Sequence, residues 1–266
     1  MILSERGIVF LLQSFEKYGN LLPKGSDIMQ KKELLSCFLP YTDHVCAERM
    51  AESLVGRVSE PYCAPRPALA AALLEQFRWA EGGVRDALTA MMAHAMQPEV
   101  EVHPAFPQLV GQLSELELKL FSEIQKQPDF PVLDFFFCLM RKENLLTQLG
   151  KDDEVELSSI ELVRRTTSFV PDDRYYLVQA GLENLLRLGL IEIVMQPKKC
   201  SLTKLTDERL EQIYMTFEPV ITAEAEQILQ KYPYMRKGEV RAQSGIIRTT
   251  TFGLMLGRAI AEEKGD

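Results

Sequence analysis

Residues 171–194 constrain the fold of this 266-residue chain more than any other segment. Pro171, Asp172 and Asp173 are typical of a helix start, because proline fits the first turn and carboxylates are stabilised at its positive end. Leucines then recur up to Leu188, and Gly189 is a typical C-terminal cap. Residues 190–194, Leu-Ile-Glu-Ile-Val, have the pattern of a strand. We therefore predict a helix that is followed directly by a strand.

Two elements downstream complete the outline of a winged helix. Residues 245–250 predict a second strand, and Thr251 can cap a last helix with apolar residues at helical spacing. Helix, helix, strand, strand is the order of a winged helix, a helix-turn-helix variant with a β-hairpin wing. Residues 195–244, between the strands, would be an insertion whose helices at 210–217 and 223–231 are separated by Pro219. For residues 103–266 we expect a winged-helix-like domain with a small β-hairpin and a helical insertion.

The first part of the chain is expected to be helical throughout. Apolar residues recur near helical spacing in five stretches, residues 3–18, 28–38, 42–58, 68–80 and 84–96. A proline-rich linker at 60–67 separates the third stretch from the fourth, and a second break at 98–107 is the expected boundary between the halves. The predicted fold class is thus mostly α, with an N-terminal helical region at residues 1–102.

The middle of the chain gives both clear and open signals. Ser114 and Glu117 have the spacing of a capping box, which predicts a helix start. The apolar run at residues 130–140 predicts a buried helix. Residues 157–168, which contain Ile160 and Leu162, fit a helix or a strand, and their pattern does not decide between the two.

Composition argues against several classes of protein. A hydrophobic content of 46% can fill a sizeable core, whereas a formal net charge of −8 argues against a general nucleic-acid or anionic-membrane binder. Five cysteines at wide, irregular spacing are unlike a secreted disulfide framework and favour a reducing cytosol. No apolar run approaches the roughly 20 residues that a membrane helix needs. We expect a cytoplasmic protein with no membrane contact.

A series of short motifs resembles a known family. Phe-Arg-Trp-Ala-Glu from Phe77, Leu-Thr-Ala-Met-Met-Ala-His-Ala-Met-Gln-Pro from Leu88, His-Pro-Ala-Phe from His103 and Leu-Ser-Glu-Leu-Glu from Leu113 occur in that order. This series resembles the bacterial abortive-infection alpha (Abi-alpha) family, as do the helix-to-strand turn at 185–193 and Thr251-Phe252-Gly253. The resemblance covers residues 68–262. It departs from the family at His94, where a polar amide is expected, and at Thr251, which directly precedes Phe252. The resemblance implies a link to phage resistance and supplies no catalytic residues.

Candidate metal and base sites are weak. His103 could be a ligand or a base at a domain junction, but a helix cap that packs the junction is the favoured interpretation. The acidic residues 152–156 lack the central glycine and terminal glutamate of an EF-hand loop. No compact zinc spacing joins Cys37, His44, Cys46 and Cys63. We therefore expect free thiols, a solvated acidic loop and no cofactor.

Several enzyme motifs are absent from the sequence. No arginine is followed four to six residues later by histidine, the pattern of many helical ribonucleases of phage defence. The chain also lacks a Gly-x-x-x-x-Gly-Lys phosphate loop, a His-Glu-x-x-His helix and a Gly-x-Ser-x-Gly elbow. We therefore predict a non-enzymatic protein.

The winged-helix interpretation makes DNA binding the alternative function. On the presumed recognition helix, the side chains that could reach a groove or a partner are Arg174, Gln179, Asn184 and Arg187. Near the wing they are Lys198, Lys199, Lys204, Arg236, Lys237, Arg241 and Arg248. Acidic residues lie among the helix positions and would repel phosphates, so we expect a protein partner or self-association rather than DNA. The predicted function is an interaction protein linked to phage defence, with a DNA-binding transcriptional regulator as the alternative.

Overall fold

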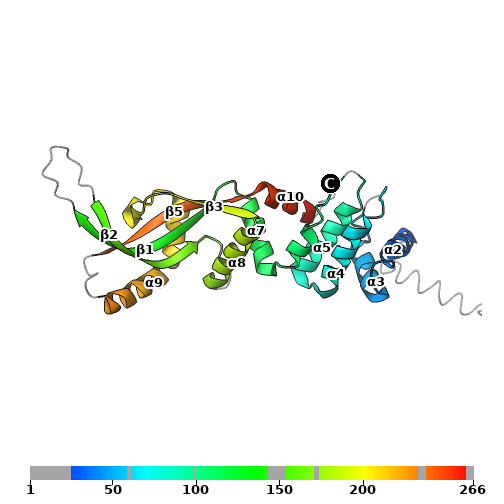
Figure 1. Cartoon of the computed structure of the whole chain (residues 1–266), viewed down its shortest axis with the longest axis horizontal. Helices are drawn as coiled ribbons and strands as arrows, with labels where there is room; N and C mark the ends of the chain where they lie inside the picture. Colours follow the sequence, from blue (N-terminus) through cyan, green and yellow to red (C-terminus); the bar gives the residue numbers. More distant parts are fainter. Residues whose placement is uncertain are drawn as a thin grey trace, which may run out of the picture. The chain divides into compact units, whose positions relative to one another are not determined.

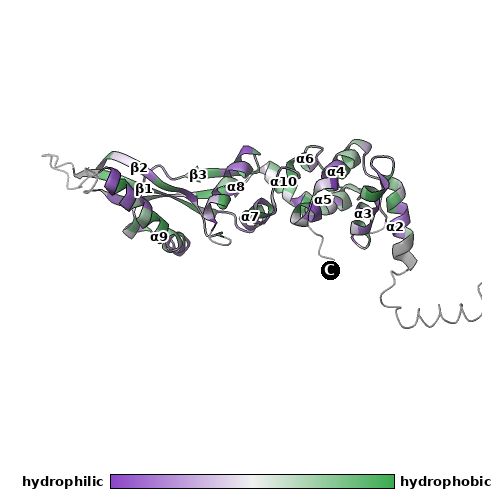
Figure 2. Ribbon diagram, turned by 90° about the horizontal axis from the view of Figure 1, so that it is seen from below, coloured by the Kyte–Doolittle hydropathy of each residue, from purple (hydrophilic) through white to green (hydrophobic). Residues whose placement is uncertain are grey.

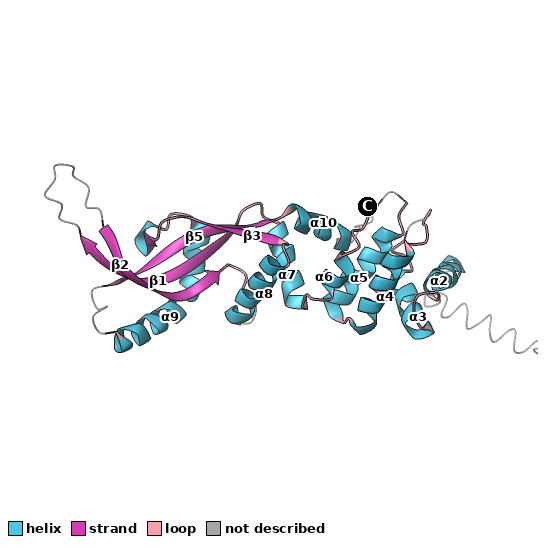
Figure 3. Cartoon of the chain, viewed as in Figure 1, coloured by secondary structure: helices cyan, strands magenta, loops and turns pink. Residues whose placement is uncertain are grey.

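The computed structural model describes residues 25–58, 61–98, 100–142, 154–170, 174–232 and 238–261 (Figure 1). The helix predicted at residues 3–18 lies outside these ranges. The chain divides into two compact units, the first formed by residues up to 112 and from 259 onward, the second by Leu113–Arg258. The strands of the described residues belong to the second unit (Figure 3).

The first unit is a set of packed helices. They are α2 (Gly25–Phe38), α3 (His44–Leu54), α4 (Pro67–Trp79), α5 (Gly82–Ala95) and the short α6 (Phe106–Val110). The helices predicted between residues 28 and 96 are thus confirmed. The carboxylate of Asp43 accepts a hydrogen bond from the Cys46 amide at the start of α3, and Pro67 occupies the first turn of α4. The fully buried residues of the first unit include Met50, Leu73, Phe77 and Leu88.

The second unit is an antiparallel sheet flanked by helices. Its strands are β1 (Phe130–Lys142), β2 (Glu154–Thr166), β3 (Ile191–Met195), β4 (Cys200–Ser201) and β5 (Glu239–Thr249). Their order is β2-β1-β5-β3, and β4 also pairs with β5. The helices are α7 (Glu115–Gln125), α8 (Tyr175–Arg187), α9 (Glu208–Lys231), α10 (Thr251–Ile260) and the 3-10 helix η2 (Leu202–Lys204).

The predicted winged-helix fold is wrong. β3 and β5 pair as the two predicted strands would, but β5 also pairs with β1, and β1 pairs with β2. The run at residues 130–140 is the inner strand β1 rather than a buried helix, and the ambiguous residues 157–168 lie largely in strand β2. β1 has apolar residues on both of its faces and therefore gives a nearly continuous apolar run, and periodicity does not separate such a run from a buried helix.

Irregular pairing curls this sheet. The register between β1 and β2 shifts at three places, and at each shift β2 carries an extra residue. Such β-bulges bend a strand and increase its twist. At one of them Arg165 has a φ of 49°, and its amide donates a hydrogen bond of 2.5 Å to the carboxylate of Asp134 on β1.

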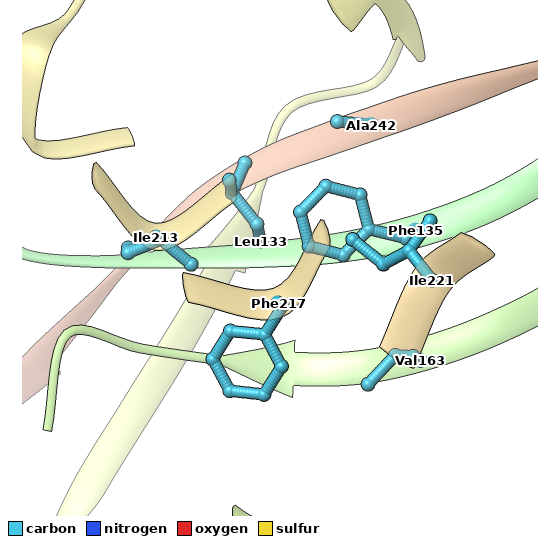
Figure 4. Packing of buried hydrophobic residues seen from close by; sticks show 7 residues of the cluster. All are labelled: Leu133, Phe135, Val163, Ile213, Phe217, Ile221 and Ala242. Carbon is cyan, nitrogen blue, oxygen red and sulfur yellow. The ribbon is translucent and has the colours of Figure 1, made fainter. Parts of the chain in front are cut away.

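Helix α9 covers one face of the sheet. Residues from β1, β2 and β5 form a buried cluster with α9, made of Leu133, Phe135, Val163, Ala242, Ile213, Phe217 and Ile221 (Figure 4). Ala225 of α9 extends the contact to Phe137 of β1. Polar and apolar residues alternate along α9, as expected for a helix with one buried side (Figure 2).

The proline in α9 does not interrupt the helix, contrary to the prediction of two shorter helices. α9 is continuous from Glu208 to Lys231 with Pro219 inside it. Pro219 is exposed, so the carbonyl group that loses its amide partner can bond to water.

Helices α7, α8 and α10 gather where β3 begins. The predicted capping box of α7 is present: the Ser114 hydroxyl accepts from the Glu117 amide at 3.2 Å, and the Glu117 carboxylate accepts from the Ser114 amide at 2.6 Å. Helix α10 is capped by Thr250 rather than by the predicted Thr251, because the Thr250 hydroxyl accepts from the Gly253 amide at 2.9 Å. Only glycine fits at Gly253, since a Cβ atom there would collide with the carbonyl oxygen of Leu190. No helix among the described residues is both long and apolar enough to cross a lipid bilayer.

Replacing Phe217 by alanine should lower the free energy of unfolding of the second unit by about 3–5 kcal/mol, because it opens a cavity between α9 and the sheet. Urea unfolding followed by circular dichroism measures this loss. Met215 on the same helix is 60% exposed, so Met215→Ala should change the free energy by less than about 0.5 kcal/mol. Equal losses in the two variants would contradict the packing of α9.

Candidate functional site

The sheet has a polar face opposite α9. In antiparallel pairs, residues directly across from each other point to the same side. Phe136 of β1 lies across from Glu161 of β2 and Arg241 of β5. Cys138 lies across from Ser159 and Glu239 in the same way. We call the side of the sheet that carries Phe136, Cys138, Ser159, Glu161, Glu239 and Arg241 the inner face.

A lysine from outside these strands crosses the inner face. Lys199 belongs to the connection between β3 and β4, which both pair with β5. Its Nζ donates hydrogen bonds of 2.8 Å to the Glu156 carboxylate and 2.8 Å to the Ser159 hydroxyl, both on β2. The same Nζ lies 4.2 Å from the centre of the Phe136 ring. Lys199 therefore links the β5 side of the curled sheet to β2 across β1.

A second cation occupies the inner face beside Lys199. The Arg241 guanidinium forms an ion pair of 2.6 Å with Glu239, two residues away on β5. In both pairs the base is less exposed than the acid: 18% against 36% for Lys199 and Glu156, and 13% against 47% for Arg241 and Glu239. The two bases thus lie deeper in the site than their carboxylate partners.

These charges shift the pKa of the groups around them. The hydrogen bond from Lys199 lowers the pKa of Glu156, and the Ser159 hydroxyl acts in the same direction against partial burial. Burial raises the pKa of the Cys138 thiol to about 11, with a further increase from the charge of Glu156. The charges of Lys199 and Arg241 oppose that increase, so both cations are close enough to act on this thiol.

A second polar cluster surrounds the bulge at Arg165 in β2. Burial raises the pKa of Asp134, which is opposed by the hydrogen bond from the Arg165 amide and by the charges of Arg164 and Arg165. The Arg165 side chain forms an ion pair with Glu183 of α8. Gln179 of the same helix donates a hydrogen bond of 2.6 Å to the carbonyl oxygen of Arg164. These contacts attach α8 to the end of β2.

Helix α8 uses its predicted contact residues within the second unit. Asn184 donates a hydrogen bond of 2.7 Å to the carboxylate of Glu117 on α7, and Arg187 donates one of 2.7 Å to the Asn184 amide oxygen. Gln179 faces the end of β2 instead, and Arg174 is an exposed residue at the N-terminal end of the helix. Of this set, Asn184 and Arg187 contact each other.

The predicted wing residues also lie at different places in the second unit. Lys199 and Arg241 meet at the inner face, while Lys198 is exposed in the loop before β4 and Lys204 is exposed at the end of η2. Arg248 forms an ion pair of 2.8 Å with Asp129. Arg236 and Lys237 lie outside the described residues.

The candidate junction histidine is next to the start of α6. The ring nitrogen Nδ1 of His103 accepts a hydrogen bond of 3.2 Å from the Ala105 amide. The ring centres of His103 and Phe106 are 5.3 Å apart. Cys46 is buried and Cys63 is exposed, and no group of three or more His, Cys, Asp and Glu residues in the described ranges is placed to hold a metal ion.

Five residues of the inner face were missed by the sequence analysis: Phe136, Cys138, Ser159, Glu161 and Glu239. The first two lie in the run that was read as a helix. A signal for β2 was present, because Ser159 and Glu161 alternate with Ile160 and Leu162, as in a strand with one polar face.

Comparison with known protein families shows which family the chain matches. The profile of the family described as abortive infection alpha matches residues 43–260, most of the chain. No curated protein and no solved structure matches the chain significantly.

Replacing Lys199 by glutamine should destabilise the second unit by at most about 1 kcal/mol at pH 7, because it removes a partly exposed ion pair. The folded-state pKa of Glu156 is lowered, so this stabilisation is present above the ordinary value of 4.5 and is lost as the pH falls through the folded pKa. Urea unfolding at pH 7 and pH 3 should show a smaller difference between the variant and the parent at pH 3 than at pH 7. Lys198→Gln is the matched control and should show no difference at either pH.

The thiol of Cys138 should resist alkylation in the folded protein. With a pKa of about 11, only about one thiol in a thousand is ionised at pH 8, and the side chain is buried. Treatment with iodoacetamide at pH 8, followed by peptide mass spectrometry, should modify the exposed Cys63 and leave Cys138 intact. Both should react in concentrated urea, and rapid native labelling of Cys138 would contradict the burial of its thiol.

Proposed function

Because the chain belongs to the abortive infection alpha family, we propose that it acts in bacterial phage defence by binding a protein partner rather than by catalysis. The family supports the first part of this proposal. The second part is supported by the inner face, where an aromatic ring and two bases lie on a side of the sheet that α9 does not cover. Aromatic residues and arginine are enriched in protein interfaces.

The contact between Ser159 and Lys199 is the one feature of this face that resembles a catalytic pair. A lysine activates a serine only when its amine is uncharged and can take the hydroxyl proton. Here the Lys199 Nζ donates hydrogen bonds of 2.8 Å to both the Ser159 hydroxyl and the Glu156 carboxylate, so it is a donor to the serine rather than an acceptor of its proton. This arrangement therefore supports a binding surface with paired charges better than it supports a catalytic serine nucleophile.

The contacts of α8 do not favour DNA binding. Gln179 and Asn184 use their amide donors on the Arg164 carbonyl and on Glu117. Both bonds would have to break before these side chains could reach a base. The winged-helix fold that made α8 a recognition helix is also not the fold of this unit.

Some phages of a broad panel should form fewer plaques on cells that carry the gene than on control cells. The control cells carry the same gene with an early stop codon. Since an abortive response acts on the infected cell, the protection should hold when few phages are added per cell and fail when many are added. Plaque counts and culture growth measure the two effects. Equal plating of both strains with every phage would contradict the defence role.

A further inference from the structure

Strand β3 forms one edge of the sheet and, among the described residues, pairs with β5 alone. The two strands stay in register from Ile191, across from Thr249, to Met195, across from Gly245. At the opposite edge of the sheet, the pairing of β2 with β1 shifts at three places. β3 is therefore the edge strand whose backbone groups keep a regular spacing.

Hydrogen bonds at both ends of β3 show which of its backbone groups point outward. The Thr250 amide donates to the Leu190 carbonyl at 3.1 Å, and the Gln196 amide donates to the Ser244 carbonyl at 2.7 Å. Even-numbered residues thus face β5, and the direction alternates along a strand. The odd-numbered residues of β3 therefore turn their amide and carbonyl groups away from β5: Ile191, Ile193 and Met195. No hydrogen bond joins these outward groups to another described residue.

The outward groups fit a second copy of the same strand. Two antiparallel copies of β3 use all three outward residues when Ile193 lies across from Ile193 of the other copy, which places Ile191 across from Met195. Each of these facing pairs is apolar. Glu192, the one charged residue of β3, lies across from Val194 and not across from itself. The strand is therefore complementary to itself in hydrogen bonding, in apolar contact and in charge.

The side chains of β3 leave apolar surface for such a contact. Val194 is 49% exposed, while Ile193 and Met195 are half-buried. On β5, the half-buried Ile246 lies across from Val194 and extends this surface. A second strand at this edge would cover part of the apolar surface and would also supply partners for the outward amide and carbonyl groups.

We propose that two copies of the chain associate through β3, as antiparallel strands related by a twofold axis at Ile193, so that their sheets become one continuous sheet. Since both copies contribute the same strand, the pairing occupies this edge of each, and association through β3 stops at the dimer. The contact is small, so we expect the dimer to be weak and reversible. This inference goes beyond the proposed function and does not depend on it.

The first test is sedimentation equilibrium of the full-length protein over a series of concentrations. The average mass should rise from that of one chain toward that of two. Ile193→Pro should weaken the association about tenfold, because both copies lose an amide that faces the other copy, while the bonds to β5 remain. Ile193→Val is the matched control, since it keeps the amide, and should associate nearly as the parent does. A parent that stays monomeric, or a proline variant that associates as the valine variant does, would overturn the proposal.

Disulfide trapping tests the register and does not require that the strand tolerate proline. Cα atoms of a directly facing pair are about 5.5 Å apart, within the range that a disulfide spans. In a background with the exposed Cys63 replaced by serine, Ile193→Cys should give a covalent dimer under mild oxidation, linked at position 193 by peptide mass spectrometry.

Val194→Cys is the control for this trapping experiment. Val194 is more exposed than Ile193, so random collision would favour a link at position 194. In the proposed register the two copies of position 194 are displaced from each other by two residues, which places them about 7–8 Å apart and beyond the reach of a disulfide. Faster linkage at position 194 than at position 193 would therefore show that the register is wrong.

Two further outcomes identify the occupant of the edge and separate this inference from the proposed function. A chain that stays monomeric but binds a synthetic peptide of residues 189–196 would overturn the choice of a second copy. A monomeric chain whose gene still reduces phage plating would overturn the inference and leave the defence role in place. A dimer linked at position 193, from a gene that leaves plating unchanged, would support the inference and remove the defence role.

Discussion

The packing of α9 against alternate residues of β1 determines how the second unit is built. Leu133, Phe135 and Phe137 point toward α9, so Asp134, Phe136 and Cys138, which alternate with them, must point to the opposite side. A shift of one residue in β1 would exchange Phe135 for Phe136 and place Asp134 against the helix. Burial of the phenylalanines thus sets the register of the strand, and the register in turn decides which polar groups reach the inner face.

Because the sheet is curled, charged residues from different strands of its inner face contact one another. The bulges in β2 bend it relative to β1, and Lys199 then reaches Glu156 and Ser159 from the β5 side. Glu156 is 43 residues away from Lys199 in the sequence, so only the strand pairing brings the two together. The ordering of this face therefore depends on long-range contacts rather than on local sequence. At the other end of the face, the Arg165 amide and the Asp134 carboxylate make a similar connection between strands.

The helical first unit and the capping box at Ser114 were predictable because their signals are local. The pairing of β3 with β5 was also predicted correctly. The error began at residues 130–140, where the inner face of β1 carries the apolar Phe136 and Cys138, so that the strand lacks the regular alternation of polar and apolar residues by which a strand is recognised. Without β1, β5 had only β3 as a partner, and a two-stranded wing was the remaining interpretation. Lys199 and Arg241 were named as contact residues from their charge alone, whereas their position beside Cys138 follows from pairings that the sequence does not display.

The bulges in β2 have a consequence for the behaviour of the protein at high concentration. A regular edge strand of 13 residues would offer its amide and carbonyl groups at even spacing, as a template on which another chain could add a strand. In β2 the three extra residues and the left-handed backbone at Arg165 break that spacing. Gln179 also occupies the carbonyl of Arg164. The irregularities that shape the inner face therefore also protect this edge from amyloid-like stacking of one copy on the next.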